Sequence, residues 1–235
     1  MKNFYNQIAN NYSNIAKKKN QFLAGVNKIL ISKLRSRKEI LDIGSGDGLR
    51  IEIIKKKLKN SRFTALESSK EMCKLFKKNS KIKLFNLDMK KLDQIHTPKF
   101  DAITCLWNVF GHLKNNSERV KVLKKIKKKM YKSSIFLTDV NNRHNALSYG
   151  YIEVVIRVLV DYFFYNEKRG DAKYDIKINN RIIRANGHLF TYKEFSNILD
   201  EAGFKIIKTY SINYNSGKIM NSLFHGQLLF LAKIK

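Results

Sequence analysis

Hydrophobic and polar positions alternate along the chain in two regimes. Stretches whose apolar residues recur every three or four positions predict helices, and they separate short apolar runs that are typical of buried strands. Because strands and helices alternate, we expect an α/β fold with a parallel sheet. The predicted strands are 40–43, 62–66, 82–85, 100–106, 135–138, 204–210 and 228–232.

Residues 140–190 interrupt this alternation. The stretch 151–165 predicts an amphipathic helix of 15 residues, too short to span a membrane. Glu153, Arg157 and Asp161 are spaced four apart on it, so two ion pairs are expected along one stripe. This helix could be a substrate lid, a dimer face or an interfacial anchor. Asn179-Asn180 then separates two alternating segments, 174–178 and 181–185, and predicts a β-hairpin.

The composition bounds the possibilities. A length of 235 residues with 43% hydrophobic residues fits a single domain with an insertion. The net charge of +28 would suit nucleic acid, but the lysine clusters are dispersed and fall on the outer faces of predicted helices. Cys73 and Cys105 are isolated, so neither a disulfide nor a metal site is expected. No apolar secretory segment opens the chain, so the expected location is cytoplasmic.

The most informative stretch is a glycine-rich turn between a strand and a helix. Gly44, Gly46 and Gly48 give the spacing G-x-G-x-G instead of the G-x-G-x-x-G of dinucleotide sites. Asp47 at the helix start would repel a pyrophosphate but would suit an amino group. Glu67 ends the next strand, 19 residues after Gly48, where an acid typically binds a ribose diol. The turn therefore predicts a ribose-bearing ligand without a pyrophosphate.

This turn resembles motif I of the class I S-adenosylmethionine-dependent methyltransferases, and the resemblance extends over most of the chain. It implies a seven-stranded, mostly parallel Rossmann-like sheet with helices on both faces, an antiparallel last strand and an inserted helix with a β-hairpin. The segment Phe100 to Leu113, an apolar strand that runs into Trp107-Asn108 and Gly111-His112, is similar to small-molecule N-methyltransferases of the sugar-amine and glycine types.

The resemblance also implies an organisation of the single domain. Residues 1–35 would form an N-terminal lid and helix, and 36–139 the cofactor-binding core. Residues 140–190 would build the acceptor pocket, and 191–235 would supply the last helix and strand pair.

Site residues follow from the same resemblance, with S-adenosyl-L-methionine as cofactor. Asp42 and the glycines would hold the methionine part, Glu67 the ribose, and Asp88 the adenine. Asp88 could instead only cap the short segment after it, and the two tyrosines could serve simple packing. The implied cofactor-binding residues are Tyr5, Tyr12, Asp42, Gly44, Ser45, Gly46, Glu67, Ser68, Asp88, Met89, Leu106, Trp107 and Asn108.

The acceptor side is less defined. His112 would face the acceptor and could act as a general base. Arg181, Arg184 and His188 are further pocket candidates, although exposed hairpin charge also explains these three residues. The expected reaction is methyl transfer to a small molecule, at an amine nitrogen before a hydroxyl. RNA methylation, methylation of a lipid headgroup and a non-enzymatic binding role stay as alternatives, with peripheral membrane contact through 151–165 and a monomeric or homodimeric state.

Overall fold

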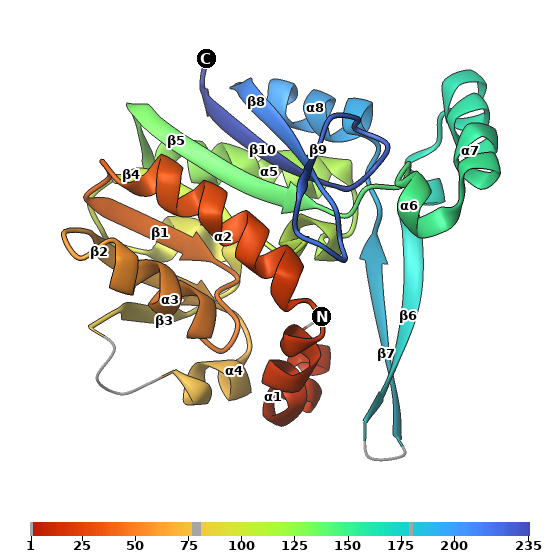
Figure 1. Cartoon of the computed structure of the whole chain (residues 1–235). Coiled ribbons are helices and arrows are strands. Elements are labelled where there is room, and N and C mark those ends of the chain that lie inside the picture. The colour runs from red at the N-terminus through yellow and green to blue at the C-terminus, as the bar shows by residue number, and fades with distance from the viewer. Residues whose placement is uncertain (1, 77–80, 179–180) are drawn as a thin grey trace.

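The computed structural model describes residues 2–76, 81–178 and 181–235. Its centre is an eight-stranded sheet in the order β3-β2-β1-β4-β5-β10-β8-β9 (Figure 1). The strands are β1 (Glu39–Ile43), β2 (Arg62–Glu67), β3 (Lys83–Asn86), β4 (Phe100–Cys105), β5 (Met130–Val140), β8 (Phe204–Ile212), β9 (Ile219–Met220) and β10 (Gln227–Ile234).

Strand directions agree with the expected sheet. The strands from β3 to β5 pair in parallel, and β10 runs antiparallel to both of its neighbours, β5 and β8. The predicted α/β fold with an antiparallel last strand is therefore confirmed. The expected count of seven strands lacked β9, which pairs at the edge with β8 through only two residues. So short a segment leaves no periodic pattern in a sequence.

Helices cover both faces of the sheet (Figure 1). On one face lie α2 (Asn20–Leu34) and α3 (Leu49–Lys57), and on the other lie α5 (Asn116–Lys128) and α8 (Tyr192–Glu201). Buried apolar side chains from each pair of helices pack against the sheet in two separate clusters. Each face thus holds one layer of the core, and the strand ends are left to form a site.

A further helix, α1 (Lys2–Lys17), lies against the edge of this arrangement, next to α4 (Lys70–Leu75) and the hairpin strand β7 (Arg181–His188). Ile8 of α1 is buried with Met72 of α4, and Ile183 of β7 packs on this cluster. Two short 3-10 helices, η1 (Met89–Gln94) and η2 (Val109–His112), follow β3 and β4.

The insertion after β5 contains α6 (Ala146–Tyr149), α7 (Tyr151–Phe163), η3 (Glu167–Gly170) and a hairpin of β6 (Asp171–Ile178) with β7. The predicted hairpin is confirmed, although both strands are longer than expected, and its Asn179-Asn180 turn lies outside the described residues. Among the helices of the described ranges, none is long and apolar enough to cross a membrane.

One of the two ion pairs expected on α7 is present. Arg157 Nε contacts Glu153 Oε1 at 2.8 Å. The prediction of a second pair, between Arg157 and Asp161, is wrong, because Asp161 binds Arg143 at 2.8 Å and His144 at 2.9 Å instead. These two residues follow β5, and the fold brings them closer to Asp161 than the neighbouring turn of its own helix.

Candidate active site

The glycine-rich turn joins β1 to α3 and depends on glycine geometry. Gly44, Gly46 and Gly48 have φ values of 74°, 59° and 80°, in the left-handed region that other residues rarely adopt. A Cβ on Gly44 would lie 2.6 Å from a methyl group of Val109. The turn therefore keeps its backbone close to the segment that follows β4, and no side chain fits between them.

Glu67, at the end of β2, is tied to this turn. Its Oε2 accepts a hydrogen bond of 2.9 Å from Gly46 N, and its Oε1 accepts one of 2.7 Å from Ser69 N. Burial raises the pKa of this carboxyl group, while the two backbone N–H donors act in the opposite direction. The carboxylate is held in one orientation at the strand end.

A cavity of about 280 Å³ opens above these strand ends. Eleven of the residues expected from the sequence line it, which places them around one space. They are Tyr5, Tyr12, Gly44, Gly46, Glu67, Ser68, Asp88, Met89, Leu106, Trp107 and His112. Val109, Leu113, Leu87 and Lys90 complete most of the remaining wall and were not expected.

Asp88 has a second role in the structure. Its Oδ1 accepts a hydrogen bond of 2.8 Å from Lys90 N and so caps η1. Both interpretations of this residue, the cap and the cavity wall, are therefore compatible with its position.

The N-terminal helix α1 supplies the roof of the cavity. The Tyr12 ring lies 5.4 Å from the Trp107 ring and covers Gly46. The Tyr5 hydroxyl is 2.8 Å from His112 Nε2. Burial raises the pKa of both tyrosines, so each keeps its proton at neutral pH. The donor of the hydrogen bond between Tyr5 and His112 therefore depends on the tautomer of the imidazole.

His112 is a neutral group in this setting. Burial lowers its pKa to about 4, and the nearby Asn186 backbone opposes the fall only in part. Its Nδ1 is buried and has no hydrogen-bond partner among the described residues. If Nε2 accepts from Tyr5 the ring proton lies on Nδ1, and if Nε2 carries the proton it donates to the Tyr5 oxygen.

A larger cavity of about 810 Å³ adjoins the first and runs between α2 and α3. Both cavities share Tyr12, Gly44, Leu106 and Trp107, so they meet at the glycine turn. Asp42 and Ser45, expected among the cofactor residues, line the larger cavity and not the smaller one.

Arg50 lines the larger cavity, as Asp42 does, and was not among the expected residues. Its Nε donates to Asn27 at 3.2 Å, whereas its Nη2 is buried without a partner in the described part of the chain. Its positive charge lowers the pKa of Asp42 and of Asp139, although burial has the larger, raising effect on both. Asp139 Oδ2 is likewise buried and unpaired. The signal in the sequence was the position of Arg50 in the first turn of the helix that follows the glycines.

The segment after β4 is held in an unusual backbone conformation. Trp107 and Asn108 have φ values of 67° and 54°, which are uncommon for residues other than glycine. Asn108 N donates to Asp139 Oδ1 at 2.9 Å, its Nδ2 donates to the His188 carbonyl at 3.1 Å, and its Oδ1 accepts from Asn141 N at 3.1 Å. Asn108 lines neither cavity; its bonds fix the backbone that presents Trp107.

The three acceptor-pocket candidates on the hairpin do not reach the smaller cavity. Arg181 and Arg184 are exposed, and Arg184 lies 3.7 Å from Asp175 on the same hairpin. His188 is buried between Asp171, at 2.8 Å, and Glu194, at 3.1 Å. The alternative of exposed hairpin charge therefore describes both arginines, and the imidazole belongs to a network that joins β7 to α8.

These features together define a class of binding site. The site combines a carboxylate at the ribose position, the close backbone of the glycine turn, and a guanidinium whose Nη2 is unpaired and whose charge acts on two carboxylates. This combination suits a nucleoside that carries a tail with both an amino and a carboxylate group. The site lies at the carboxyl ends of the strands, where open α/β sheets bind ligands.

Comparison with known proteins relates the cofactor-binding half of the sheet to a known family. Residues 40–132 match the family described as Methyltransferase domain. This part of the chain is a methyltransferase domain. S-adenosyl-L-methionine is a nucleoside whose methionine part is such a tail. No curated protein matches the sequence.

Solved structures share the whole fold. A S-adenosylmethionine-dependent methyltransferase from Clostridium acetobutylicum is 14% identical, with 98% of each chain covered and a TM-score of 0.61. CalS10, an amino pentose methyltransferase from Micromonospora echinaspora, is 13% identical over 95% of this chain and 96% of that one, with a TM-score of 0.63. The glycopeptide N-methyltransferase MtfA is 13% identical over 90% and 89%, with a TM-score of 0.63. At these identities the likeness concerns the fold.

Proposed function

We propose that this protein transfers the methyl group of S-adenosylmethionine to the amine nitrogen of a small molecule. The observation that carries the proposal is that a small cavity, roofed by a helix, has a weak base in its wall. The smaller cavity is roofed by Tyr5 and Tyr12, and the imidazole in its wall, His112, has a pKa of about 4.

The cofactor fits the residues around the two cavities. Glu67 would accept from the ribose hydroxyls, and Asp88 with Met89 would hold the adenine in the smaller cavity. Arg50 would bind the carboxylate of the methionine part, and Asp42 would attract its amino group. The cofactor supplies a methyl group already activated on a sulfonium, so the protein has mainly to orient the two reactants and exclude water.

The enclosure favours a small acceptor. Helix α1 packs on β7, and its Tyr5 is bonded to His112 across the cavity. A large substrate would have to displace this helix. The names of two similar structures, an amino pentose methyltransferase and a glycopeptide N-methyltransferase, support a small molecule or peptide that carries an amino group.

The protonation state of His112 favours nitrogen over oxygen. A group whose conjugate acid has a pKa of about 4 is a poor base for an alcohol, since general-base efficiency falls as the base weakens. An amine can lose its proton to solvent before it enters the site, and its lone pair then attacks without a strong base. Tyr5 keeps lone pairs on its oxygen that can accept a hydrogen bond from the amine.

The test compares amines with alcohols of the same carbon skeleton, using formation of S-adenosylhomocysteine as the readout. We expect turnover with amines, and a loss of rate in His112→Ala below about a hundredfold, because general-base catalysis contributes about that factor or more. Calorimetric binding of S-adenosylhomocysteine by each variant shows that the cofactor site is intact. Turnover restricted to alcohols would refute the proposal, as would a larger loss of rate in His112→Ala.

The net charge of +28 keeps RNA as a second candidate acceptor. A tRNA-binding assay at increasing salt tests it. Tight binding that weakens with salt, together with methylation of the RNA, would replace the small-molecule proposal. Absence of salt-sensitive binding would remove the RNA alternative.

A further inference from the structure

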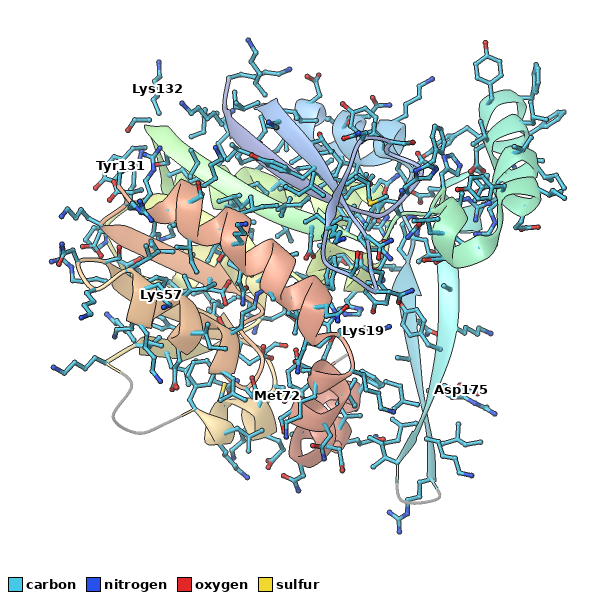
Figure 2. The ribbon with its side chains drawn as sticks, in the orientation of Figure 1. Lys19, Lys57, Met72, Tyr131, Lys132 and Asp175 are labelled. Carbon is cyan, nitrogen blue, oxygen red and sulfur yellow. The ribbon has the colours of Figure 1, made fainter. Side chains whose placement is uncertain are left out.

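Helix α7 exposes an unusually apolar surface. Figure 2 shows this helix at one corner of the molecule, with side chains that extend into solvent away from the sheet. Among its residues only Val154 is a buried apolar side chain. The exposed apolar residues of 151–165, which we name the α7 face, are Tyr151, Ile152, Val155, Ile156, Leu159, Tyr162, Phe163, Phe164 and Tyr165.

The degree of exposure is the unexpected part. Ile152 is 79% exposed and Tyr162 is 76% exposed. Scattered exposed apolar residues need no explanation, but contiguous apolar patches of this kind mark a contact with a partner or a membrane. The composition is aliphatic in the middle and aromatic at both ends.

The charges of α7 are engaged on its other side. Asp161, with a side chain 8% exposed, binds both Arg143 and His144, and Glu153 binds Arg157. Arg169 donates to the Val160 and Phe164 carbonyls at the end of the helix. Both carboxylates of the helix and its Val160 and Phe164 carbonyls are thus bonded within the protein, and the α7 face can leave water without stripping a charge.

Charge decides between two kinds of partner. The chain carries 47 lysines and arginines against 19 acidic residues. A second copy of the same chain would bring like charge against like charge, whereas an anionic bilayer would attract it. Aromatic side chains also favour the level of the lipid headgroups. A helix of 13 residues is about 20 Å long, which suits a position in the plane of the interface.

We propose that the α7 face docks on an anionic membrane surface, with Ile152, Val155, Leu159 and Phe163 inserted at the headgroup boundary. The basic surface of the protein brings it to the bilayer, and the apolar helix holds it there. This inference does not depend on the identity of the methyl acceptor.

The experiment is flotation of the full chain with vesicles of phosphatidylcholine alone or with 30% phosphatidylglycerol. We expect binding to the anionic vesicles and weaker binding to the neutral ones. The double variant Ile152→Ser with Phe163→Ser should lower the partition coefficient at least tenfold. The control is Ile207→Ser, which removes an equally apolar residue that is 50% exposed on β8, and it should bind as the unchanged protein does.

Circular dichroism and calorimetric binding of S-adenosylhomocysteine establish that each variant is folded. Binding of this ligand should not change, because no residue of the α7 face lines the smaller cavity. Three results would overturn the proposal. These are absence of binding by folded protein, binding that the double variant retains in full, and a dimer in light scattering that dissociates when the α7 face is changed. The last result would assign the face to a second copy.

Discussion

Arg50 offers the sharpest test of how the cofactor is bound. Its Nη2 is buried and unpaired, and its charge acts on both Asp42 and Asp139. We expect this guanidinium to bind the carboxylate of the methionine part. The perturbation is Arg50→Met, which keeps the length of the side chain and removes its charge and its donors.

The magnitude follows from a charged hydrogen bond at a half-buried site. Such a bond contributes about 1.5 to 3 kcal/mol, so the dissociation constant of S-adenosylhomocysteine should rise by about 10-fold to 150-fold. 5′-Methylthioadenosine has the same nucleoside but lacks the amino acid part. Its affinity should stay within about twofold, because it does not reach Arg50.

Calorimetric titration of both ligands measures the difference directly. Arg62→Met is the matched control, since Arg62 has a side chain that is 82% exposed and pairs with Glu39 at the surface. Asn27→Ala removes the partner of Arg50 Nε and should give an intermediate loss for S-adenosylhomocysteine alone. Equal weakening of both ligands in Arg50→Met, or no weakening of either, would refute the assignment.

Three other predictions concern the walls of the smaller cavity. Glu67→Gln loses a carboxylate that accepts from two backbone N–H groups. We therefore expect adenosine binding to weaken and the free energy of unfolding to fall by about 1 to 3 kcal/mol. Unchanged adenosine affinity in a calorimetric titration would contradict a ribose contact. The pKa of His112 falls from 6.5 to about 4 on folding, so its stabilising contribution is present above pH 6.5 and is lost as the pH falls toward 4. Between pH 7 and pH 5, the free energy of unfolding of the unchanged protein should fall by about 2 kcal/mol more than that of His112→Gln, as measured by denaturant unfolding. Equal falls in both proteins would show that this histidine is not buried in its neutral form. Asn108→Ala removes the hydrogen bonds of the Asn108 side chain that hold the backbone next to Trp107, the one tryptophan of the sequence. The fluorescence emission spectrum of Trp107 should therefore shift, and the affinity for the cofactor should fall. An unchanged emission spectrum would argue that other contacts hold this segment.

The sequence predicted the sheet well because local patterns determine it. Each parallel strand is a short apolar run, and the glycine turn has a spacing that few structures other than a ligand loop require. The same logic placed Tyr5 and Tyr12 together, since residues seven apart lie on one face of a helix. The structure brings both to the cavity.

The insertion was harder to predict because its contacts come from distant segments. On the hairpin, alternation separates two faces but does not say which one is covered. Ile178 and Ile183 pack toward α1, and Arg184 on the opposite face is left in solvent. Asp161 likewise prefers Arg143 and His144, which no helical spacing relates to it.

The roles of Arg50 and Asn108 could not be obtained from residue type. An arginine at the start of a helix is usually a surface group, and an asparagine after a strand usually belongs to a turn. What makes each distinctive is a missing or a completed hydrogen bond, and such a property exists only in three dimensions.

The packing of α1 bears on two steps that are chemically separate, the release of the spent cofactor and the release of the methylated product. Tyr5 and Tyr12 roof the cavity, and the same helix packs against β7 of the insertion. Neither the spent cofactor nor the methylated product can leave through the roof while α1 is docked. Whatever leaves by this route must wait for α1 to move, and for these molecules the opening rate of α1 sets an upper limit on turnover. A variant that loosens α1 would shorten the residence time of each molecule that leaves by this route.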